Sequence, residues 1–258
     1  EVRRVILLVG GTSETAPLAA ALLEAGWQVL ASMATDAPLA LPEHPRLELR
    51  RGRLDREGFV GLIAARGIAR VVDATHPFAL EARSVLREAC AHAGVPRIRF
   101  ERVTETVNMD GVDAVDGHGE AAGAAVAYGL PVLLTTGSRH LAPYVRAATE
   151  AGVPLFARVL PADESRLAVA ASGIAAGNVD YARGPFSVEE TRALLRRWGI
   201  GVLVAKDAGG ASGIAERLEA ARAEGARVVL IRRPPEEPDA AATPAAVLER
   251  LGLPEDRS

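Results

Sequence analysis

The chain has 258 residues, of which 49% are hydrophobic and 24% charged, so its composition is that of a folded protein long enough for two compact domains. A formal net charge of −3 gives no overall basic field, and we expect neither nucleic acid nor a membrane as a partner. The single cysteine, Cys90, falls on the apolar face of a predicted helix, which excludes a disulfide framework and a cysteine-based zinc site.

Two further kinds of site are not expected. No apolar run approaches the ~20 residues needed to span a bilayer, and the first strand follows without the layout of a signal peptide, so we expect a cytoplasmic protein. The five histidines show no metal-ligand spacing, which predicts no metal site.

Short β-rich runs alternate with helical patterns along the whole chain, which predicts parallel sheets with crossover helices. In the first half, strands are predicted at 4–11, 27–35, 46–52, 69–75 and 97–103, and helices near 15–25, 56–65 and 78–92. The second half repeats this rhythm, with strands beginning near residues 131, 154, 200 and 226.

Two helices of the second half have clear start signals. Ser187 and Glu190 form a capping box, and Gly199 is suited to end the helix that they begin. A short helix is predicted after Thr243 and Pro244, within a tail rich in proline and acidic residues.

The segment 108–129 is rich in Gly, Ala and Asp, and we place the domain change within it. This predicts an α/β protein with two Rossmann-like domains, 1–122 and 123–258, whose mainly parallel sheets face a central cleft. We expect a monomer.

Unusual residues gather in loops that follow predicted strands. Four loops, at 10–15, 73–78, 135–140 and 206–213, lie between a strand and a helix, and a fifth, at 182–187, precedes the capped helix. Backbone amides and the helix dipole favour anions at such positions. Each loop alone is also explained as an ordinary turn, but several together favour ligand binding.

The first-half loops suggest a nucleotide site, although the adjacent Gly10 and Gly11 do not match the GxGxxG spacing. Thr12 and Ser13 can offer hydroxyls and amides to a pyrophosphate. Ser32 and Thr35 close the second strand before any acidic residue, which favours a cofactor with a 2′-phosphate.

His76 and Lys206 each have two interpretations. His76 either contacts a cofactor or donates a proton, or it only hydrogen-bonds its own loop. Lys206 and Asp207 are either ligand contacts or a solvated surface pair, and the glycines that follow favour the ligand.

Taken in order, these motifs resemble one family, the precorrin-6A (cobalt-precorrin-6A) reductases of cobalamin biosynthesis. The matching motifs are "GGTSE" (10–14), "DATHPFA" (73–79), "TTGSR" (135–139), "RGPFS" (183–187), "KDAGG" (206–210) and "RP" (233–234). The resemblance implies an NAD(P)H-dependent reductase that adds hydride and a proton to one double bond of the precorrin-6A macrocycle, giving the 6B form. The substrate would be an anionic tetrapyrrole, with or without cobalt. The tail beyond the last motif receives no role.

The candidate site residues follow from the loops and from the resemblance. We predict His76 and Lys206 as catalytic residues, with NADPH as the cofactor and NADH as the alternative. The predicted cofactor contacts are Gly10, Gly11, Thr12, Ser13, Ser32, Thr35, Asp73, Thr75, His76 and Pro77. The predicted substrate contacts are Thr136, Gly137, Ser138, Arg139, Arg183, Ser187, Lys206, Asp207, Gly209 and Gly210.

Two other functions stay open at this point. One is a generic NAD(P)-dependent reductase of a small metabolite, but none of the three tyrosines has the lysine four residues away that such enzymes use. The other is a non-enzymatic redox sensor, which would bind NADPH without consuming it.

Overall fold

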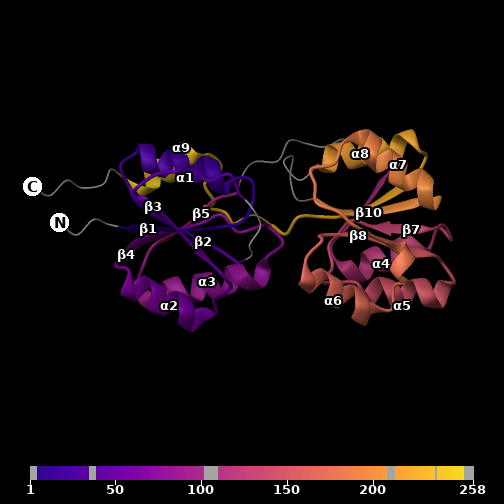
Figure 1. Ribbon diagram of the computed structural model, residues 1–258, viewed down its shortest axis with the longest axis horizontal. Coiled ribbons are helices and arrows are strands. Elements are labelled where there is room, and N and C mark those ends of the chain that lie inside the picture. Colours follow the sequence, from indigo (N-terminus) through magenta and orange to yellow (C-terminus); the bar gives the residue numbers. More distant parts are fainter. Residues whose placement is uncertain (1–4, 35–38, 102–109, 208–212, 236, 253–258) are drawn as a thin grey trace, which may run out of the picture. The chain divides into compact units, whose positions relative to one another are not determined.

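The computed structural model describes residues 5–34, 39–101, 110–207, 213–235 and 237–252. The chain divides into two compact units: unit 1 comprises Glu1–Val103 and Pro235–Ser258, and unit 2 comprises Thr104–Pro234. In each unit, helices cover both faces of one sheet (Figure 1). All neighbouring strands of the described sheets are parallel, which confirms the predicted α/β class.

The sheet of unit 1 has five strands in the order β3-β2-β1-β4-β5. The strands are β1 (Val5–Gly10), β2 (Gln28–Met33), β3 (Leu47–Arg51), β4 (Ile68–Asp73) and β5 (Arg97–Arg99). The helices are α1 (Thr15–Glu24), α2 (Arg56–Ala65), α3 (Leu80–Ala93) and α9 (Pro244–Leu251). The central strand β1 is buried on both faces, which explains its continuous apolar sequence.

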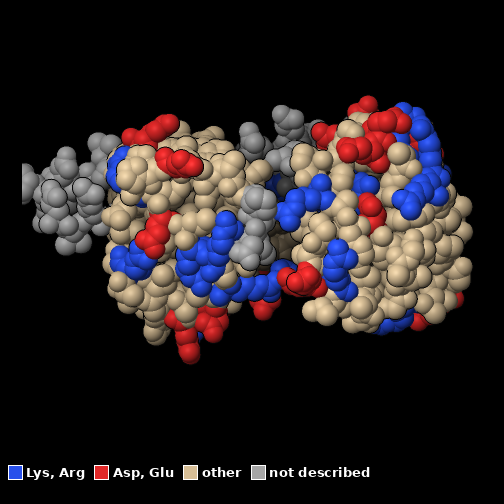
Figure 2. Space-filling view, viewed as in Figure 1, with Lys and Arg blue, Asp and Glu red and all other residues tan. Residues whose placement is uncertain are grey.

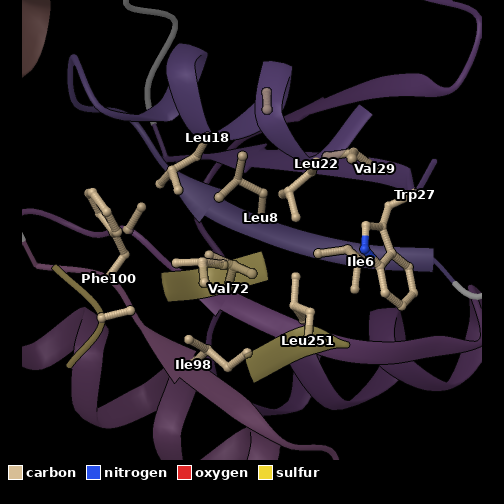
Figure 3. Close-up of a cluster of buried hydrophobic side chains, with 14 of the residues drawn as sticks. Ile6, Leu8, Leu18, Leu22, Trp27, Val29, Val72, Ile98, Phe100 and Leu251 are labelled. Atoms are coloured by element: carbon tan, nitrogen blue, oxygen red, sulfur yellow. The ribbon is translucent and has the colours of Figure 1, made fainter. Parts of the chain in front are cut away.

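Two apolar clusters hold unit 1 together, one on each face of its sheet. In one cluster, Leu18 and Leu22 of α1 pack with Leu8 of β1 and Leu251 of α9 (Figure 3). The other packs α2 and α3 against the sheet and contains Cys90, which is 3% exposed. Burial raises the pKa of the Cys90 thiol to about 11, so Cys90 is a protonated core residue at neutral pH.

The sheet of unit 2 has six strands in the order β6-β11-β10-β7-β8-β9. The strands are β6 (Val112–Val115), β7 (Val132–Leu134), β8 (Leu155–Val159), β9 (Val179–Tyr181), β10 (Val202–Lys206) and β11 (Arg227–Ile231). The helices are α4 (His118–Val126), α5 (Ala142–Ala151), α6 (Asp163–Ser172), α7 (Val188–Trp198) and α8 (Ile214–Ala223), with a 3-10 helix at Ala176–Asn178.

Helix α7 begins and ends as the sequence predicts. The Ser187 hydroxyl accepts a hydrogen bond from the Glu190 N–H, the Glu190 carboxylate accepts one from the Ser187 N–H, and Gly199 follows in the left-handed conformation. Two arginines of α7 pair with Glu189 and Glu224, and Figure 2 shows acidic and basic side chains together over α7 and α8. Exposed pairs contribute only about 0.2–1 kcal/mol each, so the cap and the buried face define this helix.

The boundary between the units corrects the predicted division at residue 122. Strand β6 pairs with β11, so the chain joins the sheet of unit 2 before that residue. The chain after Pro234 returns to unit 1, where Ala241 pairs with Phe100 and α9 packs beside α1. The sequence near β6 and near Ala241 gives no sign of the pairing with β11 or with Phe100. In the described part of the chain, no helix has both the length and the apolar character needed to cross a membrane.

Candidate functional site

The loops after β1 and β4 lie side by side at the carboxyl edge of the unit 1 sheet. The chain runs from β1 to β2 and β3 on one side, whereas β4 and β5 lie on the other. Open α/β sheets bind ligands at such a switch point. The N–H of Ala74 donates to the carbonyl of Val9 (2.8 Å), and the Thr12 hydroxyl lies 3.5 Å from the carbonyl of Ala74. The structure therefore brings together two loops that the sequence singled out.

Thr15, which is not among the predicted site residues, shapes the first loop. A Cβ atom on Gly10 would lie 2.3 Å from Thr15 Oγ1, so only glycine fits there. The buried Thr15 hydroxyl accepts hydrogen bonds from the N–H groups of Gly11 (2.9 Å) and Thr12 (3.2 Å). These amides are used inside the loop, which leaves the Thr12 side chain and the exposed Ser13 to meet a ligand.

Asp73 organises the second loop from inside the protein. Its carboxylate has no exposed surface and accepts hydrogen bonds from the N–H (3.0 Å) and hydroxyl (2.7 Å) of Thr75, from Arg97 (2.8 Å) and from Arg99 (3.1 Å). Arg99 also donates to the carbonyl of Thr75 (2.8 Å). A buried carboxylate is tolerated because it is paired in this way. Asp73 therefore holds Thr75 in place from inside the loop, and its own contact with the cofactor stays a prediction.

His76 and Pro77 are also fixed by their own loop. The Nδ1 atom of His76 accepts a hydrogen bond from the N–H of Phe78 (3.2 Å), which assigns the proton of the neutral ring to Nε2. The carbonyl of Pro77 accepts a hydrogen bond from Arg83 (3.2 Å). The His76 side chain is half-buried, so its ring is oriented by the loop while part of it remains at the surface.

At the end of β2, the predicted contact Ser32 is joined by Arg50, which the sequence did not indicate. Ser32 is only 3% exposed, and its hydroxyl accepts a hydrogen bond from Arg50 Nη1 (3.3 Å) on the neighbouring strand β3. The same Nη1 donates to the carbonyl of Gly52 (2.6 Å). The half-buried Arg50 adds a positive charge beside Ser32, whose contact with the cofactor stays a prediction, and Thr35 lies outside the described residues.

The second pair of loops lies at the switch point of the unit 2 sheet. β7 and β10 are neighbours, with β8 and β9 on one side and β11 and β6 on the other. Thr135 at the end of β7 donates its hydroxyl proton to the carbonyl of Val204 in β10 (2.9 Å). The Thr136 hydroxyl beside it is buried and makes no hydrogen bond with any described residue. A buried hydroxyl without a partner is costly, so Thr136 is suited to hydrogen-bond a ligand.

Lys206 ends β10 within a group of cations and two histidines. Burial together with the charges of Arg139 and Arg217 lowers the pKa of Lys206. The rings of His118 and His140 stack with their centroids 4.3 Å apart. Burial, His140 and Lys206 lower the pKa of His118 to about 4, and burial, Lys206 and Arg139 lower that of His140. Cations that depress one another's protonation provide a site for a carboxylate or phosphate.

The histidine pair was missed because it has no local signal. His118 begins α4, while His140 comes just before α5, so only the fold brings their rings together. The Nδ1 atom of His118 lies 2.9 Å from the hydroxyl of the buried Tyr144, whose pKa is raised by burial. In the described residues no group of three or more His, Cys, Asp or Glu side chains is placed to hold a metal ion.

The "RGPFS" loop precedes α7. Arg183 is exposed, and the Ser187 hydroxyl caps α7, while the predicted substrate contacts of both residues stay predictions. Phe186 lies against Arg158, whose guanidinium is 4.0 Å from the ring centroid. Arg158 also donates to Asp180 on the neighbouring strand (2.6 Å). The sequence did not single out Arg158, because its partners come from β9 and a later loop.

The other predicted substrate contacts have varied surroundings. Gly137 adopts a positive φ of 87° in the loop after β7, and the hydroxyl of Ser138 donates to a serine of α6 (3.2 Å). Asp207 continues β10, where its N–H donates to a carbonyl of β11 (2.9 Å) and its Oδ1 is buried without a hydrogen-bond partner among the described residues. Gly209 and Gly210 lie outside the described residues.

Comparison with known proteins agrees with this arrangement. A family model described as "Precorrin-6x reductase CbiJ/CobK" matches residues 5–252. The cobalt-precorrin-6A reductase of Priestia megaterium is 33% identical over 230 residues, covering 89% of this chain and 90% of the relative. The precorrin-6A reductase of Rhodobacter capsulatus is 34% identical over 232 residues, covering 89% and 88%.

A solved structure titled "CobK precorrin-6A reductase" aligns with a TM-score of 0.76 and 32% identity, covering 96% of both chains. Sequence and fold therefore agree over nearly the whole described chain. This chain belongs to the precorrin-6x reductase CbiJ/CobK family.

Proposed function

We propose that this protein reduces one double bond of precorrin-6A or cobalt-precorrin-6A with a nicotinamide cofactor, giving the 6B form. The observation that carries the proposal is the presence of one switch-point site in each unit, each built from the loops that resemble the family. We assign the cofactor to the unit 1 site and the macrocycle to the cationic site of unit 2.

The unit 1 loops fit a nicotinamide cofactor by their chemistry. A bound NAD(P)H supplies the hydride, and with one added proton the double bond gains two hydrogens while the cofactor leaves as NAD(P)⁺. Ser13 and the Thr12 side chain are exposed or half-buried beside a helix N-terminus, which suits a pyrophosphate. Thr75 is held by Asp73 and Arg99, so the loop beside the cofactor is fixed before binding.

We infer a preference for NADPH from the end of β3. A 2′-phosphate is met in many dinucleotide sites by an arginine near the end of the second strand. Arg50 is in that place, held by its contacts with Ser32 and Gly52. This supports NADPH by a different residue from the predicted pair Ser32 and Thr35.

The unit 2 site suits a substrate with several carboxylates. Lys206, Arg139 and the half-buried His118 gather at one end of the sheet, and Arg158 is oriented there by Asp180 and Phe186. Charge-assisted hydrogen bonds from the lysine and the arginines to carboxylates are among the strongest that a protein makes. We assign Lys206 two roles, a carboxylate contact and the proton donor, since its lowered pKa brings it closer to the pH at which a general acid is effective.

The direct test is oxidation of NADPH by the purified protein with and without precorrin-6A. We expect oxidation that depends on the macrocycle, with two hydrogens gained by the macrocycle per NADPH consumed. A generic reductase would oxidise NADPH with small carbonyl substrates, and a redox sensor would bind NADPH but oxidise none with precorrin-6A. Either of these results would contradict the proposed function.

A further inference from the structure

The segment after Pro234 enters unit 1 close to the 73–77 loop. Ala241 pairs with Phe100, its N–H donates to the carbonyl of Arg99 (2.7 Å), and its carbonyl accepts from the N–H of Glu101 (2.9 Å). Helix α9 then packs into the apolar cluster of α1. These contacts anchor the segment at the edge of the sheet, next to the arginines of β5.

Glu237 of this segment bridges two arginines that also bind the loop. Its Oε1 atom accepts from Arg83 Nη2 (3.2 Å), and its Oε2 atom pairs with Arg97 Nη2. The other amino group of Arg83 donates to the carbonyl of Pro77 (3.2 Å), and that of Arg97 donates to the carboxylate of Asp73 (2.8 Å). One carboxylate therefore connects to both ends of the loop.

We propose that Glu237 is a positioning residue that fixes the 73–77 loop for cofactor binding, acting through Arg83 and Arg97. The inference rests on the proposed function, because it takes this loop as part of the cofactor site. The contacts of Glu237 are with Arg83 and Arg97, so its effect on the loop passes through these two guanidinium groups.

The balance of charge explains why a carboxylate is needed. The connected cluster holds three carboxylates and three guanidinium groups, namely Asp73, Glu101, Glu237, Arg83, Arg97 and Arg99. The side chains of Arg83 and Arg97 are only 9% and 11% exposed. Without Glu237, two partly desolvated cations would have to find other acceptors, and each already holds the loop with its second amino group.

Glu237 is ionised at neutral pH in this environment. Burial acts to raise the pKa of its carboxyl, but the hydrogen bonds and charges of Arg97 and Arg83 outweigh burial and lower the pKa. Burial acts to lower the pKa of Arg97, but Glu237 and Asp73 outweigh it and raise that pKa. Both partners thus keep their charges through the pH range in which the enzyme would be assayed.

The test compares Glu237→Ala, Glu237→Asp and the control Glu48→Gln, which removes an exposed pair with Arg66 in the same unit. We expect Glu237→Ala to weaken NADPH binding on the order of tenfold, since small displacements of a site are costly, while precorrin-6A binding stays unchanged. Glu237→Asp should recover part of the affinity, and Glu48→Gln should match the wild type. Unchanged NADPH affinity in folded Glu237→Ala would overturn the inference.

Hydrogen exchange separates positioning from simple loss of the tail. In Glu237→Ala without cofactor, amides of residues 73–79 should exchange faster, while those of α9 keep their protection. Faster exchange in α9 as well would assign Glu237 a merely structural role. Arg83→Gln tests the same link with the Glu237–Arg97 pair left in place, and it too should loosen the loop and weaken NADPH binding.

The failure of this inference can be told apart from failure of the proposed function. Thr75→Val alters the loop itself, so it must weaken NADPH binding if unit 1 holds the cofactor. If Thr75→Val binds NADPH like the wild type, the assignment of the cofactor to this loop is wrong. If Thr75→Val weakens binding but Glu237→Ala and Arg83→Gln do not, only the role of Glu237 is wrong.

Discussion

Lys206 shows how neighbouring charges can adapt one side chain to two tasks. Arg139 and Arg217 help to lower its pKa, so a carboxylate is attracted to it and its proton is released more readily. Arginine in its place would keep the charge but not the proton transfer. We expect Lys206→Arg to lower kcat on the order of a hundredfold with nearly unchanged KM for precorrin-6A.

The pH profile provides the matching check on Lys206. The protonated amine is the active form, so wild-type kcat should fall as pH rises through its lowered pKa. Lys206→Arg should lose that alkaline limb. If Lys206→Arg keeps the kcat of the wild type, with or without a large rise in KM, Lys206 is only a charge contact and not the proton donor.

Arg50 makes the cofactor preference a matter of one cation. NADPH carries a 2′-phosphate that can pair with the Arg50 guanidinium, and NADH lacks this group. Arg50→Gln should therefore raise the Kd of NADPH roughly tenfold or more and leave that of NADH unchanged. Titration of the purified variant with each cofactor measures both. An equal loss for NADPH and NADH would mean that Arg50 only supports the fold of β3.

His118 links the acid stability of the protein to one ring. Its pKa is lowered from 6.5 to about 4 in the folded state, so folding favours the neutral ring. Its contribution to stability is complete above pH 6.5 and is lost as pH falls toward 4.

Unfolding of His118→Gln by denaturant at several pH values tests this link. Between pH 6.5 and 4, the wild type should lose on the order of 2 kcal/mol more than the variant, allowing for the partly exposed ring. Carboxylates remote from the ring titrate in both proteins and cancel in the difference. Parallel curves for the two proteins would contradict the lowered pKa.

At the scale of elements, α7 carries its own start signal, and this can be tested apart from ligand binding. The Ser187 hydroxyl donates a hydrogen bond to the Glu190 carboxylate and accepts one from the Glu190 N–H. Ser187→Ala should therefore lower the free energy of unfolding by about 1 kcal/mol, whereas Ser187→Thr should retain most of it. Thermal unfolding measures the loss. Precorrin-6A affinity should be equal in all three proteins, and weaker binding in Ser187→Ala would support Ser187 as a substrate contact.

The elements that were predicted well are those with local signals. Helix α2 runs from Arg56 to Ala65 as predicted, and Thr243 caps α9 through the N–H of Ala246. β6 and α4 lie in the segment within which the domain change was predicted. A segment rich in Gly and Ala has little hydrophobic pattern, and β6 pairs with β11, which lies far along the chain. The loops of the candidate site could likewise be predicted from the sequence. The arginines that contact these loops could not, because they come from other elements of the fold.

At the scale of the whole molecule, the two switch-point sites belong to different folding units. The loops after β1 and β4 lie in unit 1, together with the segment that carries Glu237, and the loops after β7 and β10 lie in unit 2. A ligand stabilises the structure that it binds, by about 2.7 kcal/mol at a concentration of one hundred times Kd. Each ligand should therefore leave its own pattern of protection.

Hydrogen exchange of the full chain with one ligand at a time tests this division. NADPH should slow exchange at residues 10–15 and 73–79 and in α9, because α9 shares the core of α1. Precorrin-6A should slow exchange at residues 135–141 and in α4, where Thr136 and the stacked histidines lie. The reverse pattern would exchange the roles of the two units. Protection of both units by NADPH alone would show that the cofactor is not confined to the unit 1 loops.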